Sequence, residues 1–418
     1  MTEINPIKKC RSCQSEDLSN IISLGRHYIS NFVESEKEQG EKIPLELILC
    51  NQCKLLQLRY SAPPELLWGK TYWYKSAINP IIRNDLNDIA EKSQQLIELE
   101  KGDIVIDIGC NDGTLFDYFP LNDGLGLVGF EPCKNVAKEA RSKGFKIIQN
   151  FFNAEDFKKE FSQKAKLITA ISMFYDLEDP NKFLEDIKSC LDKDGLFVIQ
   201  QNYLGSMLEQ NAFDNICFEH REYYSFNSLK TLLEKHGLEI FDVELNDING
   251  GSLRTYVKFK ENQMKGFDKA EQRISDLEKK EKEMELDTLK PYQEFAKRIE
   301  NIKKELFDFI TTEKENGKKF CGLGASTRGN TTLQYFELNS NLIECLFDRN
   351  PDKWGKKTIG TLIPIKSPDE AKRIKHDYQI IFVWHLFSGI PDDEKEFLKR
   401  GGKFILPLPK FKIVEEIK

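Results

Sequence analysis

Residues 105–116 read Val-Ile-Asp-Ile-Gly-Cys-Asn-Asp-Gly-Thr-Leu-Phe, an apolar run that ends in an acidic turn with two glycines. The β-branched residues from Ile104 to Ile108 predict a strand that is buried on both faces. Gly109 and Gly113 allow the backbone to turn tightly and to approach a ligand closely. The stretch therefore predicts a strand and a ligand-binding loop of an open α/β sheet.

A second apolar run, 125–130, ends in Glu131. Ligands lie outside the carboxyl ends of the strands in such sheets, so this acid can accept hydrogen bonds from a ribose diol. The glycine spacing is not Gly-x-Gly-x-x-Gly, and no lysine follows as in a Walker loop, so dinucleotide and phosphate-loop interpretations are weaker. A similar turn in another doubly wound protein is the alternative.

The loop resembles the Asp-x-Gly-x-x-x-Gly loop of class I S-adenosylmethionine-dependent methyltransferases. This resemblance implies S-adenosylmethionine as the cofactor, and a Rossmann-like methyltransferase domain. The expected cofactor-binding residues are Asp107, Gly109, Asn111, Asp112, Gly113, Glu131 and Ser172.

Composition excludes several classes of function. Lysine and arginine number 61 against 68 acidic residues, a formal net charge of -7, so there is no bulk positive field to attract nucleic acid. The N-terminal sequence has no apolar core typical of a signal peptide, and no apolar stretch reaches membrane-spanning length. We expect a soluble, cytoplasmic protein without membrane partners. Its ten cysteines are then expected to be metal ligands, reactive thiols or buried residues.

Two Cys-x-x-Cys pairs, Cys10/Cys13 and Cys50/Cys53, predict a structural Zn²⁺ site. Two such turns supply four thiolates in a tetrahedral array and leave no coordination position open. The alternative is two unrelated pairs, one of them a redox dithiol. Neither pair stands at a helix start after a strand, where a thioredoxin-type motif belongs.

We predict an α/β protein of several domains, because the length alone suggests about three. Residues 1–78 form the zinc module, 79–260 the methyltransferase domain, 261–317 a helical linker and 318–418 a second Rossmann-like α/β domain. Strand and helix patterns alternate through 103–260, which predicts a mostly parallel sheet. The linker is rich in Lys and Glu at helical spacing and is interrupted by Pro291, so two helices are expected. The expected strands are 43–50, 55–60, 104–108, 125–130, 146–148, 167–172, 196–200, 238–244, 252–258, 319–323, 343–347, 379–384 and 403–406.

The last domain contains a second candidate nucleotide loop, Gly324-Ala-Ser-Thr-Arg-Gly-Asn330, directly after a predicted strand. Backbone N–H groups at a helix N-terminus favour phosphate, and Arg328 can add a charge-assisted hydrogen bond. Asp348 follows the next strand, where an acid can contact a ribose or a base. An ordinary helix cap with polar residues is the alternative. Two nucleoside-type sites indicate a methyl donor and a nucleotide-linked acceptor.

Glu219 and His220 are the candidates for chemistry. The chain has five histidines, and this one is flanked by an acid and followed by Tyr223 and Tyr224, an arrangement that can hold an imidazole as a general base. A solvated loop histidine is the alternative. The stretch 72–76 is expected to cover the same cleft, or else to pack between domains.

Taken together, these motifs resemble the nucleotide-sugar C-methyltransferases over essentially the whole chain. The resemblance implies three domains and methylation at C-3 of a nucleotide-linked 4-keto-6-deoxy sugar through an enolate. It implies His220 as general base, with Glu219, Tyr74 and Tyr224 as further catalytic residues. The expected substrate-binding residues are Tyr72, Ser76, Arg254, Ser326, Thr327, Arg328, Asn330, Asp348 and His385.

The chain departs from the best-known members at four positions. Cys217 and Phe218 replace a tyrosine and a histidine ahead of the Glu-His pair, Arg328 replaces a common lysine, and His385 a common asparagine. These changes concern acceptor contacts more than reaction type. Two other functions stay open at this point, namely an O- or N-methyltransferase acting on a sugar or small metabolite, and a non-catalytic nucleotide-sugar-binding protein. The nucleotide base, the sugar stereochemistry and the choice between monomer and homodimer are also open.

Overall fold

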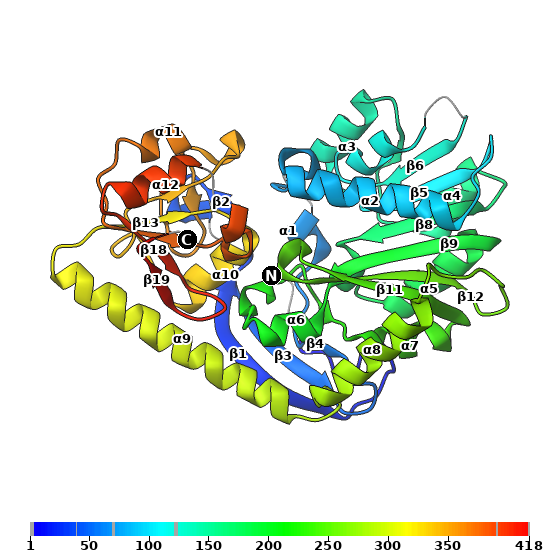
Figure 1. The fold of residues 1–418 in the computed structure, drawn as a ribbon, viewed down its shortest axis with the longest axis horizontal. Helices are drawn as coiled ribbons and strands as arrows, with labels where there is room; N and C mark the ends of the chain where they lie inside the picture. Colours follow the sequence, from blue (N-terminus) through cyan, green and yellow to red (C-terminus); the bar gives the residue numbers. More distant parts are fainter. Residues whose placement is uncertain (1–3, 39, 69–71, 121–123, 390–391, 417–418) are drawn as a thin grey trace.

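The computed structural model describes residues 4–38, 40–68, 72–120, 124–389 and 392–416. It has two lobes, each built on an α/β sheet, and a smaller N-terminal sheet that runs beneath both of them (Figure 1). Within these described residues no helix is both long and apolar enough to cross a lipid bilayer.

The first lobe is built on a seven-stranded sheet in the order β11-β12-β9-β8-β5-β6-β7. Its strands are β5 (Ile104–Ile108), β6 (Gly126–Phe130), β7 (Lys146–Ile148), β8 (Ala165–Ile171), β9 (Leu191–Asn202), β11 (Leu238–Asn246) and β12 (Ser252–Phe259). Strands β5 to β9 are parallel, whereas β12 pairs antiparallel with β9 and β11. The strand order reverses at β5, so the loops after β5 and β8 border the switch point where such sheets bind ligands.

Helices cover both faces of this sheet because its strands are apolar on both sides. On one face lie α2 (Pro80–Leu96) and α3 (Lys134–Ser142); α4 (Ala154–Glu160), α5 (Pro180–Cys190) and α7 (Phe226–Lys235) pack on the other. Helix α2 begins where the Asn79 side chain accepts a hydrogen bond from the Ile81 amide and Pro80 occupies the first turn. A short helix, α6 (Leu204–Glu209), follows β9.

The N-terminal sheet has the order β1-β3-β4-β10. Strands β1 (Leu18–Tyr28), β3 (Lys42–Cys50) and β4 (Leu56–Leu58) come from the N-terminal module and are followed by α1 (Pro64–Trp68). Its last strand, β10 (Glu222–Tyr223), comes from the first lobe and pairs antiparallel with β4. The segment directly after His220 is therefore part of the N-terminal sheet.

Two helices, α8 (Ala270–Glu283) and α9 (Lys290–Glu315), lead to the second lobe, as expected, and α9 runs along its lower edge in Figure 1. Pro291 lies in the first turn of α9, where its missing N–H costs nothing. One face of α9, which includes Phe295, Ile302 and Ile310, shares a single hydrophobic core with the N-terminal sheet and the second lobe.

The second sheet has the order β16-β14-β13-β17-β18-β19, and only its edge strand β19 is antiparallel. Its strands are β13 (Phe320–Leu323), β14 (Leu346–Phe347), β16 (Ile365–Lys366), β17 (Tyr378–Ile381), β18 (Lys403–Leu406) and β19 (Lys412–Val414). This is the strand order of a dinucleotide-binding fold. Helices α10 (Thr327–Tyr335), α11 (Pro368–Ala371) and α12 (Asp392–Lys399) belong to this lobe, and β15 (Lys357–Thr358) pairs with β2 (Phe32–Val33) of the N-terminal module.

Every expected strand overlaps an observed one, although the strand expected at 343–347 is reduced to Leu346–Phe347. The expected α/β class is confirmed. Strand β1 and the addition of β10 to the N-terminal sheet were not foreseen, because sheet pairing between distant segments has no local signature.

Candidate active site and metal centre

The loop after β5 has the geometry that its glycines predict. Gly109, Asn111 and Gly113 all have positive φ, between 52° and 74°. A Cβ on Gly109 would lie 3.2 Å from the Met173 side chain, and one on Gly113 would lie 2.9 Å from Phe145. The tight turn therefore needs glycine at both ends.

Glu131 holds this loop in place. Its carboxylate accepts hydrogen bonds from the Asn111 amide at 3.0 Å and from the Cys133 amide at 2.7 Å, and it is 4% exposed. The Gly109 amide donates to the carbonyl of Phe130 at 2.8 Å. Each carboxylate oxygen keeps a further lone pair, so Glu131 can still accept from a ribose diol.

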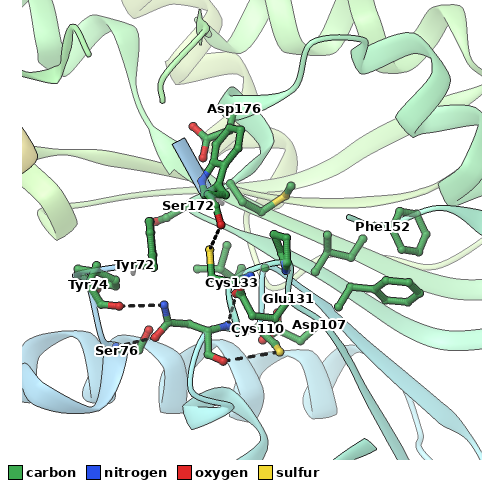
Figure 2. A pocket seen from close by; sticks show the side chains of 18 of the residues that line it. Tyr72, Tyr74, Ser76, Asp107, Cys110, Glu131, Cys133, Phe152, Ser172 and Asp176 are labelled. Atoms are coloured by element: carbon green, nitrogen blue, oxygen red, sulfur yellow. Dashed lines mark hydrogen bonds between the residues drawn. The ribbon is translucent and has the colours of Figure 1, made fainter. Parts of the chain in front are cut away.

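A cavity of about 340 Å³ opens beside the loop (Figure 2). This size is suited to a small-molecule ligand. Five of the expected cofactor-binding residues line it, whereas Asp112 supports the loop from behind by accepting a hydrogen bond from the Ala77 amide at 2.9 Å. The expected residues in the wall are Asp107, Gly109, Asn111, Glu131, Ser172, Tyr72, Tyr74 and Ser76.

Asp107 lies at the inner end of the cavity. Its carboxylate accepts a hydrogen bond from the Thr169 hydroxyl at 2.7 Å, and the residue is 5% exposed. Burial raises the pKa of Asp107 to about 7, and the nearby Glu131 carboxylate acts in the same direction.

The segment 72–76 closes one side of the cavity and touches both lobes. Asn111 accepts a hydrogen bond from the Ser76 amide at 3.1 Å and donates one to the Tyr74 carbonyl at 3.1 Å. Lys75 forms ion pairs with Glu139 at 2.8 Å and with Asp352 of the second lobe at 3.5 Å. The cavity wall is thus tied to the second lobe.

The four N-terminal cysteines form a metal centre. Their Sγ atoms all lie within 4.8 Å of one another, with Cys10–Cys53 and Cys13–Cys50 at 3.5 Å. Tetrahedral Zn²⁺ with bonds of about 2.3 Å needs sulfur atoms about 3.8 Å apart, so this donor set fits. In each pair the amide four residues after the first cysteine donates to that cysteine's carbonyl at 3.0 Å. Two equivalent turns therefore present the four ligands.

His220 lies next to the large cavity rather than in its wall. Its ring packs at a tilt against Tyr175 with centroids 4.3 Å apart, and it lines a small neighbouring cavity with Tyr203 and Tyr223. Nδ1 lies 2.9 Å from the Asn215 carbonyl oxygen. Because a carbonyl can only accept, Nδ1 carries the hydrogen and Nε2 keeps its lone pair. Burial lowers the pKa of His220 to about 4, so the imidazole is neutral at pH 7.

The residue before β10, Arg221, forms hydrogen bonds to the short helical turn that follows β8. The Arg221 amide donates to the Tyr175 carbonyl at 2.9 Å, and its guanidinium donates to the Asp176 carbonyl at 3.1 Å. Asp176, Glu178 and Arg221 all line the large cavity. Because the contact joins segments that are distant in the chain, the sequence did not identify these three as site residues.

Glu219 and Tyr224 differ in their placement. Glu219 is partly exposed, its Oε2 is buried without a hydrogen-bond partner among the described residues, and burial raises its pKa. Tyr224 is 1% exposed, donates its hydroxyl to Glu222 at 3.0 Å and packs on Phe174. Tyr224 is therefore not part of the proposed site, because its hydroxyl already donates to Glu222 inside the core.

Arg254 was expected near the acceptor, but the structure places it in an internal ion-pair network. It is 1% exposed, and its guanidinium contacts Asp85 at 2.8 Å and Asp88 at 2.6 Å. Its Nε donates to Gln200 at 2.8 Å. All its nitrogens have protein partners, so Arg254 acts by positioning Asp85, which lines the cavity.

The second candidate loop is also occupied by protein contacts. Arg328 binds both carboxylate oxygens of buried Asp214, at 2.8 and 2.9 Å, instead of standing free for a phosphate. Ser326 caps α10 by accepting from the Gly329 amide, and Thr327 begins that helix. Arg328 is therefore not a ligand-binding residue of the proposed site.

The remaining expected contacts of the second lobe lie around this loop. Asn330 donates to Ser30 at 3.0 Å, and Asp348 accepts from the Ala325 amide at 2.8 Å. Two buried polar atoms in this region, Asn330 Oδ1 and His385 Nδ1, have no partner among the described residues. They stay candidates for contact with an acceptor.

Comparisons with known proteins agree with this arrangement. Residues 10–68 match a putative zinc binding domain, 81–243 a methyltransferase domain and 247–409 a C-methyltransferase C-terminal domain. Over 416 residues the chain is 30% identical to C-methyltransferase NovU of Streptomyces niveus, and the match covers 98% of both chains. The chain belongs to the C-methyltransferase family. As a member of that family it is an S-adenosylmethionine-dependent enzyme with an N-terminal zinc-binding domain.

Two more distant relatives each match less than half of this chain. The C-methyltransferase is 25% identical to the tRNA U34 carboxymethyltransferase of Campylobacter jejuni over 191 residues, which is 42% of this chain and 60% of that one. The structure of the plantazolicin methyltransferase BpumL in complex with SAH is 13% identical, with a TM-score of 0.35, and covers 44% of this chain and 86% of the other.

Proposed function

We propose that this C-methyltransferase acts on the carbon α to the ketone, at C-3, of a nucleotide-linked 4-keto-6-deoxy sugar, with His220 as general base. The observation that carries the proposal is a neutral imidazole whose Nδ1 donates to the Asn215 carbonyl, so that Nε2 keeps its lone pair, in a residue whose neighbour Arg221 lines the cofactor cavity.

A carbon bound to hydrogen becomes a nucleophile only after it loses that proton, and the adjacent ketone makes the loss possible. Nε2 of His220 takes the proton. The electrons of the C–H bond form a carbon–carbon double bond, and the carbonyl π electrons move to oxygen. The enolate carbon would then form the new carbon–carbon bond to the methyl group as the C=O bond returns, while the sulfonium–methyl bond would break with its electron pair staying on sulfur, so that the donor would leave as a thioether. Alignment of two bound reactants removes about 7–11 kcal/mol of the barrier.

The residues of the first cavity fit S-adenosylmethionine, which supplies an electrophilic methyl group when it is bound. Glu131 is placed for the ribose hydroxyls, and the left-handed Gly109 lets the ligand approach the loop backbone. Ser172, at the end of β8, lines the same cavity. Tyr72 and Tyr74 of the 72–76 segment line it as well.

A nucleotide-linked acceptor is supported by the second lobe. Its strand order is typical of nucleotide-binding sheets, and its ligand-binding edge faces the first lobe through Arg328–Asp214 and through Asn350, whose side chain donates to the Trp73 carbonyl at 3.1 Å. His385 and Asn330 offer unpaired buried polar atoms at that edge. The acceptor would then span from this edge to His220.

The test is His220→Asn. We expect turnover to fall about 10²–10⁴-fold, because a general base is lost, while S-adenosylmethionine affinity measured by calorimetry stays unchanged. His236→Asn is the matched control, since His236 lies at the C-terminal end of α7 and binds Asn181. Turnover close to that of the unmodified enzyme in His220→Asn would remove His220 from the base role.

The pH dependence gives a second check on the same residue. The pKa of His220 is lowered to about 4 in the free enzyme, so Nε2 remains unprotonated from pH 8 down to about pH 5. We expect kcat/KM to fall only below that pH. A fall centred near pH 6.5 would indicate an unperturbed histidine or a different base.

Substrate class is tested by incubating the enzyme with labelled methyl donor and dTDP-, GDP- or CDP-linked 4-keto-6-deoxy sugars. Mass spectrometry should show the gain of one methylene, and the sugar α-carbon should exchange hydrogen with deuterated solvent when the methyl donor is absent. Methylation on oxygen or nitrogen would contradict the proposal.

A further inference from the structure

The cavity wall contains a carboxyl group that the mechanism above does not use. Asp176 ends the short helical turn Phe174–Asp176 after β8 and lines the large cavity (Figure 2). Its Oδ1 is buried and has no hydrogen-bond partner among the described residues. A buried polar atom without a partner costs about 1–3 kcal/mol, so its retention in a ligand cavity points to a bound partner.

Asp176 and His220 are held by one set of contacts. His220 packs at a tilt against Tyr175, the neighbour of Asp176, with 4.3 Å between ring centroids. Arg221, the neighbour of His220, donates its amide to the Tyr175 carbonyl and its guanidinium to the Asp176 carbonyl. Two segments that are distant in sequence are therefore held against each other, with Asp176 in the wall of the large cavity and His220 in the wall of the small neighbouring one.

The surroundings of Asp176 favour a neutral carboxyl group. The carboxyl groups of Glu219 and Glu222 lie near it, and both also have a buried oxygen without a partner among the described residues. Arg221 donates to the carbonyls of Asp176 and Ala62 and pairs with Glu178 at 3.3 Å. Burial, together with the Glu219 charge, raises the pKa of Asp176 well above its ordinary value.

We propose that Asp176 is a further catalytic residue, whose protonated carboxyl group donates a hydrogen bond to the keto oxygen of the acceptor. This inference rests on the proposed function. As His220 takes the proton from the α-carbon, the carbonyl π electrons move to oxygen, and the Asp176 O–H stabilises the resulting oxyanion. A carboxylic acid kept neutral in a dry site is a known way to stabilise an enolate. The carboxyl proton stays on Asp176, so no further proton acceptor is needed.

The experiment compares Asp176→Ala with Asp176→Asn. Loss of one oxyanion donor should lower both turnover and deuterium exchange at the acceptor α-carbon about 10²–10³-fold in Asp176→Ala. Asp176→Asn keeps a donor N–H of similar shape and should retain both rates within about tenfold. Equal losses in the two variants would overturn the proposal, because they would indicate an ionised carboxylate. Exchange at the rate of the unmodified enzyme in Asp176→Ala would also overturn it.

Asp179→Asn is the matched control. Asp179 is exposed, lies in the same segment and caps α5 by accepting from the Lys182 amide, which an asparagine can do equally well. It should keep the turnover of the unmodified enzyme. Calorimetry should give a methyl-donor affinity within about threefold of the unmodified enzyme for the Asp176 variants, about 0.7 kcal/mol, which would show that the cavity is intact.

An infrared measurement separates this inference from the proposed function. The difference spectrum between the unmodified enzyme and Asp176→Asn, recorded without any acceptor, should contain the carbonyl stretch of a protonated carboxylic acid. A carboxylate signal in its place would refute the inference, whatever the acceptor is. If the unmodified enzyme neither exchanges nor methylates any keto sugar, it is the proposed function that fails.

Discussion

The loops after β5 and β13 are built on one plan but end in different environments. In each loop a glycine with positive φ, Gly109 or Gly324, donates its amide at 2.8 Å to the carbonyl of the last residue of the neighbouring strand. The residue that follows this neighbouring strand is Glu131 or Asp348. It accepts one hydrogen bond from an amide of the loop and another from the amide two residues further along its own segment. Both acids therefore clamp a loop at a switch point.

The difference lies in what faces the acid. Glu131 borders an open cavity, whereas the Lys353 ammonium lies 3.4 Å from Asp348 and donates to the Ala325 carbonyl at 2.6 Å. Lys353 is 9% exposed, so an internal cation fills the position next to the second acid. The shared arrangement of loop glycine and acid does not by itself make a nucleoside-binding site. The space beside it must also stay open.

The largest expected effect separates the two acids directly. Glu131→Ala should reduce S-adenosylmethionine affinity roughly 10²–10⁴-fold and abolish turnover, because two hydrogen bonds to a charged acceptor are lost at about 1.5–3 kcal/mol each. Asp348→Ala should leave that affinity unchanged, since Asp348 holds only its own loop. Calorimetry on both variants is the measurement. Equal losses would abolish the distinction between the loops.

A smaller effect sharpens the role of the second loop. Arg328→Ala leaves the buried carboxylate of Asp214 without its bidentate partner and should destabilise the protein by about 3–5 kcal/mol. The Arg328→Ala/Asp214→Ala pair should restore part of that loss in chemical denaturation. If the single change lowers acceptor affinity without lowering stability, Arg328 is a phosphate ligand after all.

The smallest expected effect concerns the residue two positions before the loop glycine, which lies in the central strand of each sheet. Asp107 lies two residues before Gly109, and Gly322 occupies the same position before Gly324. The pKa of Asp107 is about 7 in the folded protein, above its ordinary value near 3.8. A raised carboxyl pKa favours the folded state at low pH, and this contribution is lost as pH rises from about 4 through 7.

The free energy of unfolding without ligand should therefore contain a term of about 4 kcal/mol that disappears between pH 4 and pH 8. Asp107→Asn should remove this pH dependence. Denaturation curves at both pH values measure it. A profile in Asp107→Asn identical to that of the unmodified protein would show that Asp107 titrates normally.

The metal centre could be predicted from residue order because both cysteine pairs form local turns. Each pair needs only a few consecutive residues to set its geometry, and the four sulfur atoms do meet. The same holds for the loop after β5, whose glycines and acids fit the observed cavity. Adjacent residues set the geometry of a turn, which is why the positions of the four cysteines and the shape of this loop could be predicted.

Other assignments depended on which segments meet in space. Arg328 and Arg254 carry the right charge for a ligand site, but their partners Asp214 and Asp85 are distant in sequence. Asp176 was missed for the same reason, because its place in the cavity wall and its contact with Arg221 depend on which segments meet. A charge alone does not say whether its partner is a ligand or the protein.

The sequence by itself determined the α/β class, the four metal ligands and the turn after β5, because short-range periodicity and turn residues encode them, whereas the role of His220 stays a prediction. Tertiary structure decided that β10 completes the N-terminal sheet, that His220 donates through Nδ1 and that Lys353 occupies the second loop. Those features arise from packing between segments far apart in the chain. Burial there sets the protonation states, and the Lys353 ammonium fills the space next to Asp348 while the space next to Glu131 stays open.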